Sequence, residues 1–253
     1  RDVAVTGVQT CALPIFSEVM ELKNAVALVT GGSSGIGQGI AEALIAAGAK
    51  VAITGRDKAK LEAAAKAMGA HAIHADSSKE ADAQRAVAET IAKFGDLDIL
   101  VNNAGLGVFK PLLEMDLAGF EKTFATNVTG AMLMGREAAK YFASKNKGNI
   151  INIGSTASHR GAPNGTAYYA TKFALRGMTE CWRAELRKYN IRVMLVNPSE
   201  VITNFGVAAG FQQKDNPSKL RSEDIAHAVI GVLQMNDRGF TTELTVFATN
   251  PQD

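Results

Sequence analysis

The chain carries little cysteine and almost no net charge. Two cysteines occur among 253 residues, Cys11 and Cys181, so a disulfide framework is excluded and a reducing, cytoplasmic location is expected. Lysine and arginine total 27 against 25 for aspartate and glutamate, and the resulting charge of +2 indicates neither nucleic acid nor an acidic membrane surface as a partner. No apolar run approaches the length of a membrane span.

Metal-ligand spacings are also missing. His71 and His74 flank Ile73 on a short expected strand, and His159 and His227 stand alone. Histidines placed in this way are more often structural or surface groups than ligands, because a metal site needs several ligands in a fixed geometry. We therefore expect no metal.

The first residues differ from the rest of the chain. Residues 5–15 resemble a translated sequencing adapter, because their codons can be chosen to reproduce a common adapter oligonucleotide. A signal peptide is the alternative, but balanced charges and polar interruptions of the apolar stretch argue against it. We expect residues 1–19 to be a non-native leader, Met20 to be the native start, and residues 20–253 to form a single domain.

Short apolar runs alternate with helical patterns along that domain. Strands are expected at 25–30, 50–54, 70–75, 97–101, 149–153, 191–196 and 243–247. Helices are expected at 35–47, 57–68, 79–94, 116–144, 167–189 and 222–233. This order predicts an α/β fold, a single doubly wound Rossmann domain whose parallel seven-stranded sheet has helices on both faces. The irregular segment 203–220 is expected to be either a functional lid or a disordered loop, and to lie at the carboxyl edge of the sheet.

A glycine-rich turn follows the first expected strand, with the sequence Thr30-Gly31-Gly32-Ser33-Ser34-Gly35-Ile36-Gly37. Glycines permit a tight turn and let the backbone approach a pyrophosphate closely. The N–H groups at the start of the next helix can then bind that anion. The turn predicts a dinucleotide site, although its spacing differs from the common G-x-G-x-x-G pattern.

Tyr168 and Lys172 stand four residues apart on an expected helix, and Ser155 precedes them by thirteen residues. Side chains at i and i+4 share a helix face, so both can act on one small volume. An ammonium beside a phenol favours the phenolate, so we expect Lys172 to lower the pKa of Tyr168 and make it a usable acid and base. Tyr169 is the competing phenol, but Phe173 occupies its i+4 position.

Together these motifs resemble the short-chain dehydrogenase/reductase family, from about Leu22 to the C-terminus. The residues that carry the resemblance are Thr30-Gly31-x-x-x-Gly35-x-Gly37, Asn102-Asn103-Ala104-Gly105, Asn127, Ser155 and Tyr168-x-x-x-Lys172. The chain departs from the family at Ser199, where glycine usually follows the proline. It also lacks the glycine-rich ending frequent among β-ketoacyl carrier-protein reductases.

The resemblance implies a catalytic set of four residues. Tyr168 would protonate the developing alkoxide when a carbonyl is reduced, and Ser155 would hydrogen-bond the carbonyl oxygen. Lys172 would hold the hydroxyls of the nicotinamide ribose. Asn127 would anchor a water that connects Lys172 to solvent. The implied activity is the interconversion of a carbonyl and a secondary alcohol, with a 3-oxoacyl substrate as one option.

The end of the second expected strand bears on the cofactor. Gly55 stands where family members that prefer NAD usually carry aspartate, and the guanidinium of Arg56 suits a ribose 2′-phosphate. Asp57 is expected to cap the next helix. These features predict NADP. The resemblance implies cofactor contacts from Gly31, Ser33, Ser34, Gly35, Ile36, Gly37, Arg56, Asp76, Ser77, Asn103, Ala104, Gly105, Tyr168, Lys172, Pro198, Val201 and Thr203.

Two other functions remain open at this point: an NAD-dependent alcohol dehydrogenase on the same fold, and a nucleotide-binding sensor without turnover. The resemblance also suggests a homodimer or homotetramer formed by pairing the helices at 116–144 and 167–189. Small residues would allow the close approach of these helices, namely Ala138, Ala139, Ala174 and Gly177.

Overall fold

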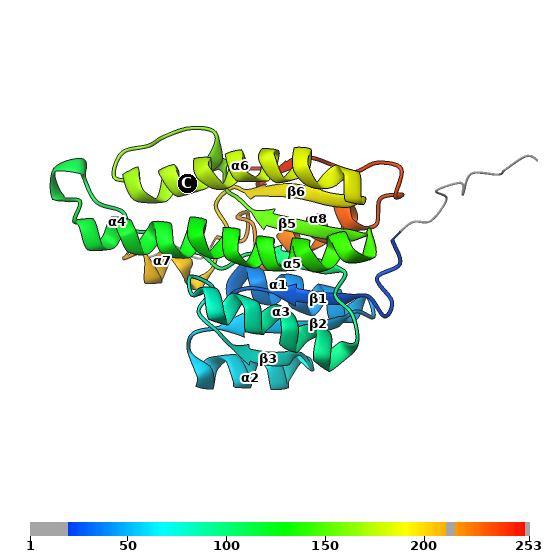
Figure 1. Ribbon diagram of the computed structural model, residues 1–253. Coiled ribbons are helices and arrows are strands. Elements are labelled where there is room, and N and C mark those ends of the chain that lie inside the picture. Colours follow the sequence, from blue (N-terminus) through cyan, green and yellow to red (C-terminus); the bar gives the residue numbers. More distant parts are fainter. Residues whose placement is uncertain (1–19, 211–215, 251–253) are drawn as a thin grey trace, which may run out of the picture.

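A computed structural model describes residues 20–210 and 216–250. The expected leader, residues 1–19, lies outside the described residues. Seven parallel strands form one sheet in the order β3-β2-β1-β4-β5-β6-β7 (Figure 1). They are β1 (Val26–Val29), β2 (Lys50–Gly55), β3 (His71–His74), β4 (Ile99–Asn102), β5 (Gly148–Ile153), β6 (Ile191–Pro198) and β7 (Glu243–Val246). The seven-stranded parallel sheet is therefore confirmed.

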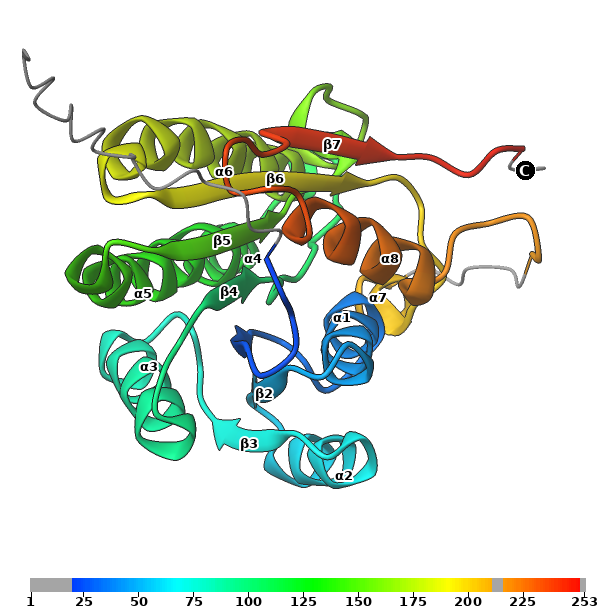
Figure 2. The ribbon, with the colours of Figure 1, turned by 90° about the vertical axis from the view of Figure 1, so that its right-hand side faces the viewer.

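Helices cover both faces of the sheet, as Figure 2 shows end-on. One face packs against α1 (Gly35–Ala46), α2 (Lys58–Met68) and α8 (Ser222–Leu233), and the other against α3 (Glu80–Phe94), α5 (Ala131–Lys145) and α6 (Thr166–Leu186). Alternate strand residues feed the two cores: in β1, Ala27 and Val29 join one, and Val26 and Leu28 the other. The strands are apolar throughout because both faces are buried.

The expected continuous helix at 116–144 is wrong in its middle. The structure places α4 (Leu117–Phe124) first, then a π-helical segment η2 (Ala125–Gly130), then α5. Asn127 lies inside η2, and its side chain bonds to the backbone of Leu106, 21 residues earlier. π-Helical turns frequently occur at functional sites, because they re-aim a side chain out of the regular helical path.

Two further differences concern helix ends and the expected lid. The helix predicted at 167–189 runs instead as α6 followed by a 3₁₀ turn, η4 (Arg187–Tyr189). Within the segment predicted to be irregular, a short helix α7 (Asn204–Ala208) forms after β6, and residues 211–215 lie outside the described residues. Two more 3₁₀ turns are η1 (Leu112–Glu114) and η3 (Thr156–Ser158).

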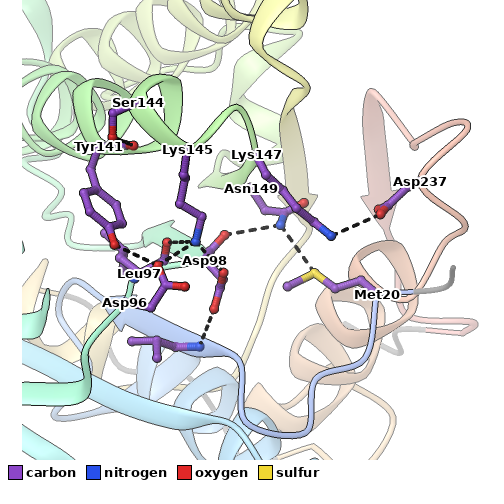
Figure 3. A network of polar contacts seen from close by, with 11 residues as sticks. Met20, Asp96, Leu97, Asp98, Tyr141, Ser144, Lys145, Lys147, Asn149 and Asp237 are labelled. Atoms are coloured by element: carbon purple, nitrogen blue, oxygen red, sulfur yellow. Dashed lines mark hydrogen bonds and ion pairs between the residues drawn. The ribbon is translucent and has the colours of Figure 1, made fainter. Parts of the chain in front are cut away.

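Polar contacts cross the amino ends of the central strands (Figure 3). Lys145, at the end of α5, donates to Asp96 over 2.6 Å and to Asp98 over 2.7 Å, just before β4 begins. Asp98 in turn accepts a 2.9 Å hydrogen bond from the backbone N–H of Val26 at the start of β1. These contacts fix two strand starts and one helix end at the edge opposite the glycine turn.

Candidate active site

A cavity of about 730 Å³ opens at the carboxyl edge of the sheet. The glycine turn after β1 lines one part of it, and Ser155, Tyr168 and Lys172 line another. The neighbours β1 and β4 belong to different halves of the strand order, and open α/β sheets bind ligands where the order reverses. Every predicted cofactor-binding residue except Gly37 lines this cavity.

The glycine turn is shaped for close approach by a ligand. Gly31 and Gly35 have positive φ values of 65° and 58°, which side chains rarely adopt. A Cβ added to Gly37 would lie 2.3 Å from the side-chain nitrogen of Asn103, so a glycine at this position allows Asn103 to pack against the turn. Ser34 precedes α1 without a side-chain capping bond, so it leaves the first N–H groups of the helix to other acceptors. These features fit the phosphates of a dinucleotide.

Hydrogen bonds join the glycine turn to the end of β4. The hydroxyl of Thr30 accepts from the backbone N–H groups of Asn103 and Ala104, both at 3.0 Å. The side chain of Asn103 donates back to the carbonyl oxygens of Thr30 at 2.9 Å and Gly31 at 3.3 Å. The predicted segment 103–105 is therefore held rigidly beside the turn.

The ends of β2 and β3 form the far end of the cavity. Arg56 is exposed and lines the cavity, while Asp57 caps α2 by accepting from the N–H of Lys60 at 3.0 Å, as predicted. Asp76 and Ser77 line the same region. This end of the cavity therefore carries the cation Arg56, while the carboxylate of Asp57 caps a helix and that of Asp76 accepts from Ser78.

Tyr168 and Ser155 meet at the opposite end. Ser155 lies in the turn between β5 and η3, where its hydroxyl accepts from the N–H of Ala157 at 3.1 Å. Burial raises the pKa of Tyr168 to about 12, although the side chain of Ser155 acts in the opposite direction. The expected lowering of this pKa is therefore wrong for the protein groups alone.

The reason lies in the position of Lys172. Its ammonium donates to the carbonyl oxygen of Ile153 over 2.8 Å and lies 5.7 Å from the centre of the Tyr168 ring. Burial lowers the pKa of Lys172 to about 8, so its own charge is disfavoured. Both groups thus have pKa values shifted against their charged forms, a pattern that is common in catalytic sites.

Asn127 lies behind the cavity and does not line it. It accepts from the N–H of Leu106 at 2.9 Å, and it donates to the carbonyl oxygen of Leu106 at 2.8 Å and to the hydroxyl of Thr171 at 3.0 Å. Thr171 donates to the carbonyl oxygen of Tyr168. Asn127 therefore connects the loop after β4 with the helix that carries Tyr168 and Lys172.

A polar cluster behind Ser155 was missed at the sequence level. The fully buried Asn197 accepts from the N–H of Ser155 at 3.1 Å and donates to Glu243 of β7 at 2.8 Å. Glu243 also contacts His159 at 2.8 Å and Arg176 at 3.3 Å. The carboxylate can only accept and the N–H can only donate, so the amide orientation of Asn197 is fixed. Glu243 lies 88 residues from Ser155 in the sequence, which left no local signal.

The segment after β6 keeps a regular path despite the Ser199 departure. Ser199 donates its N–H to the carbonyl oxygen of Val246 at 2.9 Å and is not among the described residues with positive φ. Pro198, Val201 and Thr203 line the cavity, and Thr203 lies 3.4 Å from where a Cβ of Gly35 would be. Serine therefore fits at position 199 without strain.

The described ranges contain neither a metal-binding cluster nor a membrane-spanning helix. No cluster of three or more His, Cys, Asp or Glu side chains could hold a metal ion there. His71 contacts Glu89 at 3.0 Å, and His74 bonds to the carbonyl oxygen of Arg56 at 2.8 Å. Among the helices of 20–210 and 216–250, none has the length and apolar content to cross a membrane.

Comparisons with known proteins agree with this geometry. The family model for short chain dehydrogenases matches residues 25–214. (+)-Borneol dehydrogenase 2 of Salvia officinalis is 34% identical over an alignment 258 positions long. The alignment covers 88% of this chain and 91% of the relative. A 3-ketoacyl-(acyl-carrier-protein) reductase from Brucella melitensis, complexed with NADH, superposes with a TM-score of 0.83 at 34% identity, covering 90% of this chain and 98% of its own.

A second solved structure, from an archaeon, contains a derivative of NADP instead of NADH. An alcohol dehydrogenase from Thermococcus sibiricus, complexed with 5-hydroxy-NADP, superposes with a TM-score of 0.82 at 28% identity, covering 91% of this chain and 100% of its own. The family match spans well over half of the sequence and includes the glycine turn, Ser155, Tyr168 and Lys172. The chain belongs to the short-chain dehydrogenase family of oxidoreductases.

Proposed function

We propose that the protein is an NADP-dependent oxidoreductase that interconverts a carbonyl and a secondary alcohol. The observation that carries the proposal is one cavity with the glycine turn at one part and Ser155, Tyr168 and Lys172 at another. A bound nicotinamide supplies the hydride in reduction and accepts it in oxidation. The protein residues orient the substrate and move the proton.

The proton chemistry follows from the hydrogen bonds. The hydroxyl of Ser155 accepts from the N–H of Ala157, so its own proton can be donated to a carbonyl oxygen in the cavity. Tyr168 remains protonated at neutral pH and donates its phenolic proton to the alkoxide oxygen as the C–H bond forms. Lys172, released from Ile153, would bind the ribose hydroxyls, and Asn127 would hold the loop and helix around it.

The direct test is carbonyl-dependent loss of nicotinamide absorbance by the purified chain. We expect turnover with NADPH and a ketone, and slower turnover with NADH. A 3-oxoacyl thioester belongs in the substrate panel, because the Brucella melitensis reductase is similar in fold and sequence. Nucleotide binding without turnover of any carbonyl or alcohol would support the sensor alternative. Faster turnover with NADH would support the NAD-dependent alternative.

The choice of NADP rests on the end of β2. A Cβ at Gly55 would lie 3.3 Å from the Ser33 hydroxyl oxygen and 3.3 Å from Leu61, so an acidic side chain there would be crowded. Arg56→Ala is expected to weaken NADPH binding by about 1–3 kcal/mol, the range for hydrogen bonds to charged groups, and to leave NADH binding nearly unchanged. Calorimetric titration with both nucleotides measures this.

The matched control is Lys58→Ala. Lys58 is exposed at the start of α2, two residues after Arg56. It pairs with Glu62 at 3.9 Å and does not line the cavity. It should leave both affinities unchanged. Equal losses for NADPH and NADH in Arg56→Ala would contradict the proposed contact with a 2′-phosphate.

We also propose a homodimer or homotetramer, built on the outer face of α5 and α6. Ala139 and Gly177 are candidates for close contact there, since a Cβ at Gly177 would meet nothing within 4 Å. Ala138 is fully buried in the core of its own subunit and would not contribute. Light scattering at micromolar concentration tests the proposal, and a monomer would contradict it.

A further inference from the structure

Aromatic side chains surround Tyr168 at its end of the cavity. The ring of Phe109, from the loop after β4, lies 5.3 Å from the Tyr168 ring, and that of Phe205 in α7 lies 5.5 Å away. Tyr169 stands edge-on to Tyr168 at 6.0 Å. Phe109, Phe205 and Tyr169 all line the cavity. Three aromatic rings thus lie beside the ring of the proton donor.

Gly107 allows the two phenyl rings to converge. A Cβ at this position would lie 2.5 Å from Cε2 of Phe109 and 2.9 Å from Cζ of Phe205, closer than carbon atoms normally approach. The two phenyl rings are inclined to the Tyr168 ring by 43° and 52° rather than stacked on it. Phe109 and Phe205 therefore form a wedge of apolar faces beside the ring of Tyr168, which we call the Phe109–Phe205 wedge.

Charge is distributed unevenly along the cavity. The lining cations Arg56 and Lys60 belong to the far end, after β2, and Lys172 donates to Ile153. Among the described residues after β6 that line the cavity, the charged one is an acid, Glu200, which pairs with Lys219 at 2.9 Å. Among the described residues, the wedge itself presents no cation to a substrate anion, and an unpaired buried carboxylate is strongly disfavoured.

We propose that the substrate is an uncharged ketone or secondary alcohol with a ring next to the reacting carbon, and that this ring packs in the Phe109–Phe205 wedge. This inference rests on the proposed function and names its substrate class. A ring has fewer rotatable bonds than a linear chain of equal carbon number, so it loses less conformational entropy on binding. Aromatic faces add favourable contacts with it.

Three ketones test the proposal. Cyclohexyl methyl ketone and 2-octanone have the same number of carbons, and 4-acetylcyclohexanecarboxylate adds a charge to the ring compound. We expect kcat/KM for the uncharged ring compound to exceed that for 2-octanone by about tenfold, and that for the carboxylate by about a hundredfold. Equal or better turnover of 2-octanone, or of the carboxylate, would overturn the proposal.

Variants locate the preference in the wedge. Phe109→Ala, Phe205→Ala and Gly107→Ala should each reduce the ring-to-linear ratio of kcat/KM toward one while NADPH binding stays unchanged. Phe173→Ala is the control, because Phe173 is 45% exposed on the same helix as Tyr168 and does not line the cavity. It should keep the wild-type ratio. An unchanged ratio in all three wedge variants would contradict the proposal.

Failure of the proposed function gives a different result. If none of the ketones is turned over by nucleotide-loaded protein, the proposed reaction fails. The substrate class is then decided by binding alone, with a titration of the nucleotide-loaded protein by the two uncharged ketones. Binding of cyclohexyl methyl ketone about tenfold tighter than 2-octanone would support the wedge, and equal affinities would overturn it.

Discussion

At the amino ends of the strands, Lys145 donates to two carboxylates, those of Asp96 and Asp98, at 2.6 and 2.7 Å. At the carboxyl ends, Lys172 donates to a backbone carbonyl, that of Ile153, at 2.8 Å. Lys172 is buried and Lys145 is partly buried, but Lys145 alone of the two pairs with side chains of opposite charge. The two ends of the same sheet therefore surround a lysine in different ways.

The pKa values show the consequence. Burial acts against the charge of Lys145, but hydrogen bonds to Asp96 and Asp98 outweigh it and raise the pKa of Lys145. Burial likewise opposes the charge of Asp96, yet the bond from Lys145 leaves its pKa lowered. For Lys172 burial acts alone, and the pKa falls to about 8.

This difference separates a structural charge from a reactive one. Lys145 and Asp96 hold each other's charge, since the pKa of the lysine is raised and that of the carboxyl is lowered, so this pair stabilises the fold while both are ionised. Groups at the carboxyl edge are desolvated without an opposite charge, so their protonation can change when a ligand binds. The comparison predicts that substitutions at the two edges affect different properties of the protein.

Tyr168→Phe should give the largest effect, and on activity alone. Without the phenolic proton donor, turnover of the best ketone should fall roughly 10²–10⁴-fold. The melting temperature should hardly change, since only one hydroxyl is lost and the ring keeps its contacts with Phe109 and Phe205. Steady-state kinetics and thermal denaturation measure the two effects.

Tyr169→Phe is the control for this substitution. Tyr169 also lines the cavity, but its i+4 neighbour is Phe173, so its hydroxyl has no lysine one turn away. Its loss should cost much less turnover. If Tyr168→Phe retained near wild-type turnover, the proposed mechanism would fail, and with it the assignment of the carboxyl edge as the reactive one.

Lys145→Met should produce the reverse pattern. The change leaves two carboxylates without their cation, so the free energy of unfolding should fall by about 1–3 kcal/mol, the cost of unsatisfied partly buried groups. Turnover per folded molecule should stay unchanged, because the site is at the other edge. Urea denaturation followed by circular dichroism measures the loss.

Lys140→Met tests whether any lysine on α5 would give the same result. The side chain of Lys140 is 62% exposed and pairs with Glu137, so its removal should change stability by less than about 0.5 kcal/mol. A comparable loss for both lysines would mean that the partly buried position of Lys145, between two carboxylates, has no effect on stability.

The sequence predicted the parts of the fold and site that depend on local pattern. Apolar runs located all seven strands, and the glycine turn and the Tyr168–Lys172 spacing pointed to groups that the structure places around one cavity. These signals are readable because strand burial and helix spacing repeat over a few residues.

The features of the fold and site that the sequence did not predict depend on contacts between residues far apart in the chain. Within the π-helical turn Asn127 bonds to Leu106, and the Ser155–Asn197–Glu243 cluster connects the end of β5 with β6 and β7. The pKa of Tyr168 was predicted in the wrong direction, because helix spacing suggested charge proximity and gave no measure of burial. Burial is a property of the assembled fold.

Lys172→Met should raise the free energy of unfolding, whereas Lys145→Met should lower it. The expected change is the smaller of the two. The pKa of Lys172 is about 8 in the folded protein against an ordinary 10.5, which corresponds to a penalty of about 3 kcal/mol below pH 8. Loss of the hydrogen bond to Ile153 offsets about 1 kcal/mol of the gain. Methionine keeps an apolar stem of similar length, so the variant should be about 1–2 kcal/mol more stable at pH 7.

The pH dependence of this gain gives the stricter test. Between pH 8 and 10.5 the unfolded chain binds a proton at Lys172 that the folded protein has released, so wild-type stability gains from this residue as pH rises through that window. The advantage of Lys172→Met at pH 7 should therefore shrink by pH 10, as followed by urea denaturation at both values. Lys188→Met is the control, since Lys188 is exposed over the ring of Tyr189 at 5.1 Å and should show no such trend. A Lys172→Met protein less stable than wild type at pH 7 would show that the carboxyl edge stabilises this charge, and the contrast between the two edges would be lost.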